Sequence, residues 1–145
     1  MITSMFEIEP ALIRRLRETL PEFVTVDGVG VLAGVQNLEP LCPAALVLPL
    51  GFAGPVGTPP PNVFLAERQR WQVTVCVAHT PPASTVVTGG AYVLRILRAL
   101  EHWSPQPGWG RLKHVGLDDP WFDLGHVEFS LVFEVRPLPL DTGTP

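Results

Sequence analysis

Two stretches of the chain alternate between apolar and polar residues, the pattern of a β-strand with one buried face. They cover residues 71–77 and 127–135. In the first stretch, Trp71 and the valines at every second position after it should face a core. Arg70, Gln72 and Thr74 should face outward. The alternation describes a scaffold and contains no catalytic pattern.

Three further segments have the features of strands. Residues 44–50 are almost entirely apolar, as expected for a strand near the centre of a sheet that is covered on both faces. Shorter strands are predicted at 23–26, ending at the turn dipeptide Asp27-Gly28, and at 111–116. The alternating stretches extend to strands at 64–79 and 121–136, with a turn at Asp118-Asp119-Pro120 before the second.

Two segments have the spacing of amphipathic helices. Residues 6–20 begin with acidic residues and an early proline, which suit a first helical turn, and Pro21 ends the segment. The second helix is predicted at residues 91–103. The apolar stripes are Ile8, Leu12, Leu16 and Leu20 in the first helix and Val93, Leu94, Ile96, Leu97 and Leu100 in the second.

Proline and glycine mark the connections. Residues 51–62 contain four prolines and three glycines, so neither a helix nor a sheet ladder should continue through them. Residues 80–90 are expected to form a second irregular loop whose tip carries Val86 and Val87. The end of the chain, 137–145, has three prolines and should be weakly anchored unless a neighbour binds it.

The order of elements is helix, short strand, strand, long strand, helix, short strand and long strand, which predicts an α+β fold. We expect a two-layer sandwich in which an antiparallel or mixed β-sheet is covered on one face by two helices. A chain of 145 residues lies within the usual size of one domain. We therefore expect one domain at 1–136, followed by a proline-rich tail at 137–145.

Composition favours self-association over nucleic-acid binding. Hydrophobic residues make up 46% of the chain and charged residues 17%, so apolar surface should remain exposed after folding. The net charge of −4 provides no basic surface for phosphates. No stretch approaches the roughly 18 consecutive apolar residues of a membrane span, and the first residues lack a targeting pattern. We expect a soluble, unprocessed chain with no membrane partner.

Residues that could carry chemistry are sparse. Cys42 and Cys76 share no metal-binding spacing and are most simply packing residues in a reducing, intracellular setting. The best cluster for a metal ion or proton transfer has poor spacing, and its acids are of types that turns select. It comprises His114, Asp118, Asp119, Asp123 and His126.

Other enzyme signatures are missing from the sequence. No serine lies in a Gly-x-Ser-x-Gly turn, and the glycines at 28–34 lack the lysine of a phosphate-binding loop. The tryptophans lack flanking basic residues, so they are expected in the core or at interfaces: Trp71, Trp103, Trp109 and Trp121. We expect no catalytic residue, cofactor or metal ion.

Five motifs follow one another in a specific order along nearly the whole chain. They are Ile-Glu-x-Ala-Leu-Ile-x-Arg-Leu at 8–16, Pro-Ala-x-x-Val at 43–47, Trp-x-Val-x-Val at 71–75, the helical segment 94–100 followed by Trp-Ser-Pro at 103–105, and the closing strand. In this order and spacing the chain resembles the tail terminator proteins of Mu-like phages and related prophages. The proline-rich segment 51–62 departs from that pattern.

The resemblance implies a small structural virion protein without catalytic activity. Proteins of this family form a hexameric ring on the head-proximal end of the tail tube, stop tail polymerisation and present the surface that joins the head. The implied partners are further copies of the chain, the tail tube protein, a head-completion or neck protein, and the sheath protein as an additional candidate. DNA would pass through the lumen without specific binding, and the implied location is the virion tail after assembly in the host cytoplasm.

Six residues are candidate contacts, chosen from composition and not from a family motif; each has local packing or simple solvation as its alternative. They are Phe52 and Val56 in the first loop, Arg68 and Arg70 on the outer face of the long strand, and Val86 and Val87 at the second loop tip.

Three alternative functions remain open from the sequence. A neck or tail completion adaptor would also be small, oligomeric and non-enzymatic. A small metal-dependent enzyme would use His114, Asp123 and His126. A nucleic-acid-binding module is disfavoured by the charge balance.

Overall fold

The computed structural model describes residues 4, 6–53, 68–80, 84–123 and 125–138 of the chain. In these residues the strands form one six-stranded sheet in the order β1-β2-β3-β6-β4, with β5 also paired to β6. The first pair, β1 and β2, is parallel and the others are antiparallel, so the sheet is mixed. The elements are α1 (Glu9–Thr19), β1 (Thr25–Gly28), the 3-10 helices η1 (Val29–Leu32) and η2 (Glu39–Leu41), β2 (Ala44–Ala53), β3 (Arg68–Ala78), α3 (Thr85–Leu100), β4 (Lys113–Leu117), β5 (Trp121–Phe122) and β6 (His126–Val135).

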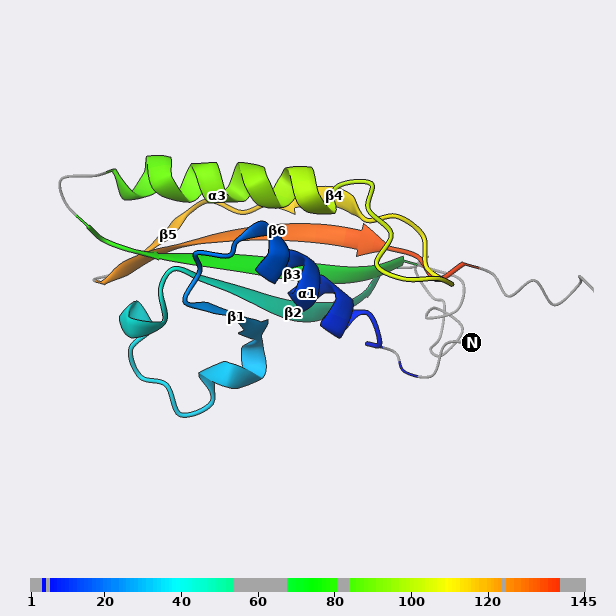
Figure 1. The fold of residues 1–145 in the computed structure, drawn as a ribbon, viewed down its shortest axis with the longest axis horizontal. Coiled ribbons are helices and arrows are strands. Elements are labelled where there is room, and N and C mark those ends of the chain that lie inside the picture. The colour runs from blue at the N-terminus through cyan, green and yellow to red at the C-terminus, as the bar shows by residue number, and fades with distance from the viewer. Residues whose placement is uncertain (1–3, 5, 54–67, 81–83, 124, 139–145) are drawn as a thin grey trace, which may run out of the picture.

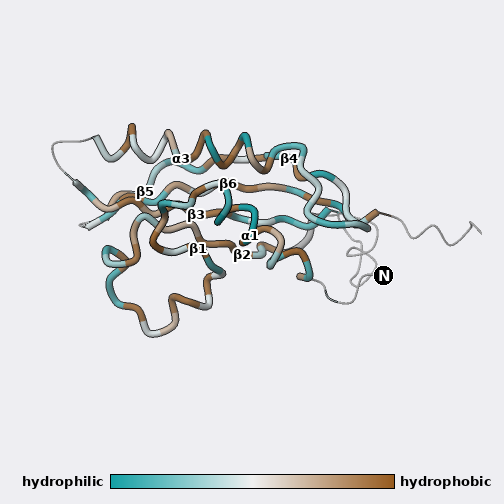
Figure 2. Tube along the Cα trace, viewed as in Figure 1, coloured by the Kyte–Doolittle hydropathy of each residue, from teal (hydrophilic) through white to brown (hydrophobic). Residues whose placement is uncertain are grey.

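The main core lies between one face of the sheet and the two helices, which confirms the predicted α+β sandwich (Figure 1). The alternation predicted for β3 is also confirmed, because Trp71 and Val73 are buried while Arg70 on the opposite face is exposed. Hydrophobic residues run through the central strands and also along α3 (Figure 2). The buried partners of Trp71, Val73 and Val75 on β6 are Phe133, Leu131 and Phe129.

Two residues fix the position of α3 on the sheet: Gly89, on the face toward the sheet, and Arg95, on the flank toward α1. A Cβ at Gly89 would lie 2.1 Å from Cε2 of Phe129, so the helix backbone passes directly over this ring of β6. On the flank toward α1, Arg95 donates to the carbonyl of Thr19 at 2.6 Å and pairs with Glu22 at 2.6 Å. Hydrogen bonding by Arg95 lowers the pKa of the Glu22 carboxyl. The opposite flank of α3 therefore faces the β4 side of the sheet.

The start of α3 corrects the predicted loop at 80–90. The helix begins at Thr85, six residues before the expected position, and Ser84 caps it by accepting a hydrogen bond from the backbone N–H of Val87 at 3.3 Å. The β-branched residues and paired glycines suggested irregular structure. Here the serine cap and the close packing of Gly89 outweigh their low helix propensity.

The last strands correct the predicted turn at 118–120. The chain reverses after β5, where the N–H of Asp123 donates to the carbonyl of His126 at 2.9 Å. Both β4 and β5 are antiparallel to β6 on the same side, so they form one edge strand interrupted at 118–120. Pro120 has no N–H to continue the ladder, which interrupts the strand without reversing it. The long strand expected at 121–136 is therefore β5, a tight turn and β6.

Three smaller expectations also change. Asp27 and Gly28 lie within β1 and do not form a turn, because β1 is the parallel partner of β2 and starts two residues later than expected. The strand β2 continues to Ala53, whereas the rest of the 51–62 connection lies outside the described residues. Pro137 is buried and bridges to Trp109, so the expected weak anchoring is wrong for the first residues of the tail.

Candidate assembly surfaces

The residues considered for a metal site are divided between the two ends of β6. His114 on β4 pairs with Phe133, whereas His126 is the first residue of β6. The His126 ring instead lies 3.3 Å from the Glu128 carboxylate and beside Trp121. Among the described residues, no group of three or more His, Cys, Asp or Glu side chains could hold a metal ion.

Both cysteines are packing residues, as the sequence indicated. Cys76 is fully buried in a second small cluster with Ala44 and Leu46, against which Cys42 also packs. Burial, with nearby Glu39, raises the pKa of the Cys42 thiol to about 11. Burial, with nearby Glu128, raises the pKa of Cys76 to about 12. Both thiols are free and stay protonated at neutral pH.

The sheet face away from the main core carries a charged cluster at one end. Glu134 is only 5% exposed, and its carboxylate is 3.1 Å from Nε of Arg70 and 3.2 Å from an Nη atom of Arg68. Both arginines are about half exposed, which confirms their predicted outward direction. Their outer surfaces remain open to a partner while Glu134 fixes their position.

The rest of this outer face is polar or covered. Gln72 donates to Thr74, whose hydroxyl is 3.2 Å from that of Ser130 across the strands. Beyond them, η1, η2 and their connections cover the Cys76 cluster. At these described residues the outer face is therefore polar or covered.

One edge of the sheet concentrates exposed apolar side chains. Val87 is 72% exposed and Phe122 is 59% exposed. Because Gly89 lies over Phe129, the first half of α3 runs beside the positions of β6 that pair with β4 and β5. Leu117 and Phe122 pair with Leu131 and Val127, which face the helices, so they adjoin the exposed residues on this flank of α3. Trp121 pairs with Glu128 and lies on the other face of the same edge. We call this surface the apolar edge; it comprises Val86, Val87, Leu94, Leu117, Trp121 and Phe122.

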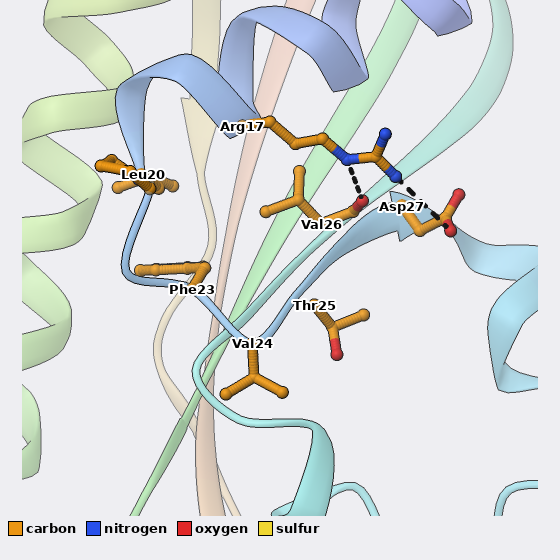
Figure 3. Close-up of a pocket in the computed structure, with 8 residues that line it drawn as sticks. Arg17, Leu20, Phe23, Val24, Thr25, Val26 and Asp27 are labelled. Atoms are coloured by element: carbon orange, nitrogen blue, oxygen red, sulfur yellow. Dashed lines mark hydrogen bonds and ion pairs between the residues drawn. The ribbon is translucent and has the colours of Figure 1, made fainter.

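The opposite edge of the sheet is hollowed where α1 meets β1. A groove of about 280 Å³ is lined by Arg17, Leu20, Pro21, Phe23, Val24, Thr25, Val26 and Asp27 (Figure 3). Arg17 extends from α1, donates through Nε to the carbonyl of Val26 at 3.1 Å, and lies 3.9 Å from the Asp27 carboxylate. We call this surface the β1 groove. It combines an exposed cation with a partly apolar lining, and its Val24 side chain is 64% exposed.

A comparison with protein families shows to which family the chain belongs. The family model described as phage tail terminator protein matches residues 1–139, which include every described element. The chain belongs to the phage tail terminator family. No curated protein matches the chain.

Membership of the phage tail terminator family assigns a structural role in a phage tail and a place in the virion. This is a family of structural proteins, and membership indicates interaction with other phage proteins of the tail and head. In the described residues of this family member, no helix has the length and apolar character needed to cross a membrane.

The candidate contacts of this terminator-family chain lie on several surfaces. Val86 and Val87 are exposed in the first turn of α3, which corrects their placement at a loop tip and puts them on the apolar edge. Arg68 and Arg70 share the cluster around Glu134. Phe52 lies in β2 in register with Gln69, and Val56 lies outside the described residues.

Several exposed residues of the two edges were not recognised from the sequence. Leu94 was assigned to the apolar face of its helix, and Phe122 was included only as part of the strand predicted at 121–136. The signal that could have found Leu117, Trp121 and Phe122 is three large apolar residues around Asp-Asp-Pro, a combination typical of an exposed interrupted strand. Val24 and the β1 groove depend on how α1 docks, which no local pattern specifies.

Proposed function

We propose that this chain is a tail terminator that assembles into a homohexameric ring on the head-proximal end of the phage tail tube. The ring would stop tail polymerisation and provide the surface to which the head is joined. The observation that carries this proposal is the family match across residues 1–139. Domain 1–136 would form the ring subunit, with 137–145 as its tail.

The partners follow from this role. Further copies of the chain form the ring, the tail tube protein contacts one of its faces, and a head-completion or neck protein contacts the other. The sheath protein is an additional candidate. A net charge of −4 supports a lumen through which DNA passes without specific binding. Protein contacts alone perform this function, so it needs no cofactor or catalytic residue.

Physically, termination requires a subunit that matches the last exposed interface of the tube on one face and offers a different surface on the other. The described residues offer at least three dissimilar surfaces: the apolar edge, the β1 groove and the arginine cluster around Glu134. This variety supports a subunit that contacts several partners at once.

The test is the solution mass by light scattering, with negative-stain images, over a range of protein concentrations and with purified tail tubes. We expect six-membered rings, either alone or formed on the tube end, and tubes capped in this way should not elongate on adding tube protein. A chain that stays monomeric and leaves tube growth unchanged would contradict the proposal and favour a neck or tail completion adaptor.

A further inference from the structure

The two edges of the sheet differ in both shape and charge. The apolar edge projects exposed side chains, and the exposed Asp118 and Asp119 lie between its residues Leu117 and Trp121. The β1 groove is hollowed and carries Arg17 together with Asp27. A closed ring of identical subunits joins one surface of each copy to a different surface of the next. The two edges are therefore candidates for the two halves of one repeated contact.

We propose that the acidic and apolar segment 117–122 of one copy docks into the β1 groove of the next copy. This inference rests on the proposed ring and names the surfaces that close it. The first strand of each sheet would then face the interrupted edge strand of its neighbour, since β1 and β4/β5 lie at opposite edges (Figure 1).

Charge complementarity supports this pairing. The side chains of Asp118 and Asp119 are exposed, and no described residue forms a hydrogen bond or an ion pair with either carboxylate. The interruption is nevertheless held in place, because the N–H of Asp118 donates to the carbonyl of Ser130 at 3.0 Å. In the groove, the Arg17 side chain is 59% exposed and only loosely paired with Asp27. An acidic segment would provide it with closer anionic partners.

The apolar parts of the two surfaces also correspond. Leu117, Trp121 and Phe122 flank the acidic pair and are exposed. Around Arg17, the groove offers the exposed Val24, while Phe23 in its lining is buried in the main core. Docking would remove Val24 of one copy and the exposed apolar side chains of segment 117–122 of the next from water, and burial of apolar surface favours subunit association.

A symmetric contact of like edges is less favourable. If two apolar edges met about a two-fold axis, Asp118 and Asp119 of one copy would approach the same residues of the other, and like charges brought together disfavour a contact. Joining like edges would also produce a closed dimer and leave both β1 grooves empty. Joining unlike edges continues around a ring.

The contact can be tested by cross-linking the full chain with a short bis-maleimide. Val24→Cys places a thiol at the β1 groove and Asp119→Cys places one on the interrupted strand. Wild type is the control for the native cysteines, because Cys76 is buried but Cys42 is only partly buried. Cys42→Ala in every variant removes the accessible native thiol. The double variant should give a ladder of covalent species that ends at the ring size. Wild type and each single variant should give no ladder.

The outcomes separate this contact from the proposed function. Rings seen by light scattering together with the ladder support the contact. Rings without a ladder, or covalent dimers from Asp119→Cys alone, overturn the contact while leaving the terminator function standing. A chain that stays monomeric with and without tail tubes overturns both.

Charge exchange provides a second readout that does not depend on cysteine chemistry. Asp118→Lys with Asp119→Lys should weaken the association constant of each contact roughly tenfold. Adding Arg17→Glu to this variant should recover most of the loss, because opposite charges would again face each other. Unchanged assembly in the double lysine variant, or no recovery in the triple variant with a normal circular dichroism spectrum, would overturn the pairing.

Discussion

At the scale of single residues, Gly89 shows how one missing side chain positions a helix. Alanine is ordinarily favoured over glycine inside a helix by about 1 kcal/mol. At Gly89, however, the added Cβ would lie 2.1 Å from the Phe129 ring, and such overpacking typically costs about 1–3 kcal/mol. We therefore expect Gly89→Ala to lower the free energy of unfolding measured in urea by circular dichroism.

Gly90 is a matched control for this substitution. It follows Gly89 in the same helix, is exposed, and has no heavy atom within 4 Å of the position its Cβ would take. Gly90→Ala should raise the free energy of unfolding by about 0.5–1 kcal/mol. If both variants shift stability in the same direction, the close approach of α3 to Phe129 does not control stability.

Cys76 makes stability depend on pH in the alkaline range. Burial raises its pKa from 9.0 to about 12, so above pH 9 the unfolded chain ionises while the folded chain does not. The stabilisation is complete below pH 9 and is lost as the pH rises from there toward 12. At pH 10, one unit above the pKa of the thiol in the unfolded chain, the free energy of unfolding should be about 1 kcal/mol lower than at neutral pH.

The comparison for this prediction is Cys76→Ala, which keeps a small apolar side chain and removes the titrating group. Its unfolding free energy should fall less steeply than that of wild type between pH 8 and pH 10, measured by urea titration. Parallel slopes for the two proteins would show that the Cys76 thiol does not contribute to the alkaline loss.

At the scale of elements, the sequence indicated each strand of the sheet except the separate β5, and it indicated both helices. The alternation around Trp71 and the apolar spacing of α1 both arise because one face of each element is buried. Burial of one face is visible in the local sequence, so these elements could be predicted. The boundaries that were wrong depend on distant contacts. Gly89 reads as a helix breaker until Phe129 is known to occupy the space beside it.

The candidate contacts divide in the same way. Val86 and Val87 were selected because apolar residues beside prolines and glycines suggest exposure, and both are exposed, although their helix was not foreseen. The outward direction of Arg70 followed from alternation, but its buried partner Glu134 lies 64 residues away in the chain. The β1 groove arises from the docking of α1 against a parallel edge strand and has no local signature.

The start of α3 offers a test of the apolar edge that spares the fold. Val86 and Val87 are exposed, and aspartate in the first turn of a helix interacts favourably with its dipole. The double variant Val86→Asp with Val87→Asp should therefore keep its secondary structure and unfolding midpoint. We expect it to weaken ring formation or tube capping at least tenfold, because two desolvated carboxylates would enter an apolar contact.

Val35→Asp is the control for that variant. Val35 is also exposed and apolar, but it lies in the connection between η1 and η2, away from the apolar edge. It should leave assembly unchanged in sedimentation or light scattering. Normal assembly of the Val86 and Val87 variant, with unchanged circular dichroism, would remove these residues from the candidate contacts.

At the scale of the whole molecule, basic residues gather at one end of the sheet. Arg68 and Arg70 begin β3, Lys113 begins β4, and Arg136 follows β6. Arg111 lies just before β4 and is exposed like the others. These five are half of the 10 basic residues in the chain. If copies join edge to edge, the ends of the strands remain free, so this basic end is available to a partner outside the ring.

This arrangement predicts that ring formation and tube capping can be separated. Replacing Arg68, Arg70 and Glu134 together by glutamine removes the charges while keeping hydrogen-bonding side chains, so no buried carboxylate loses its cations. We expect the variant to form rings of normal mass by light scattering, since none of these residues lies on either edge. Its affinity for tail tubes or for the neck protein should fall about tenfold, because exposed cations steer and orient partners of opposite charge. Loss of the ring in a folded variant would place the arginine cluster between copies and contradict the edge-to-edge arrangement.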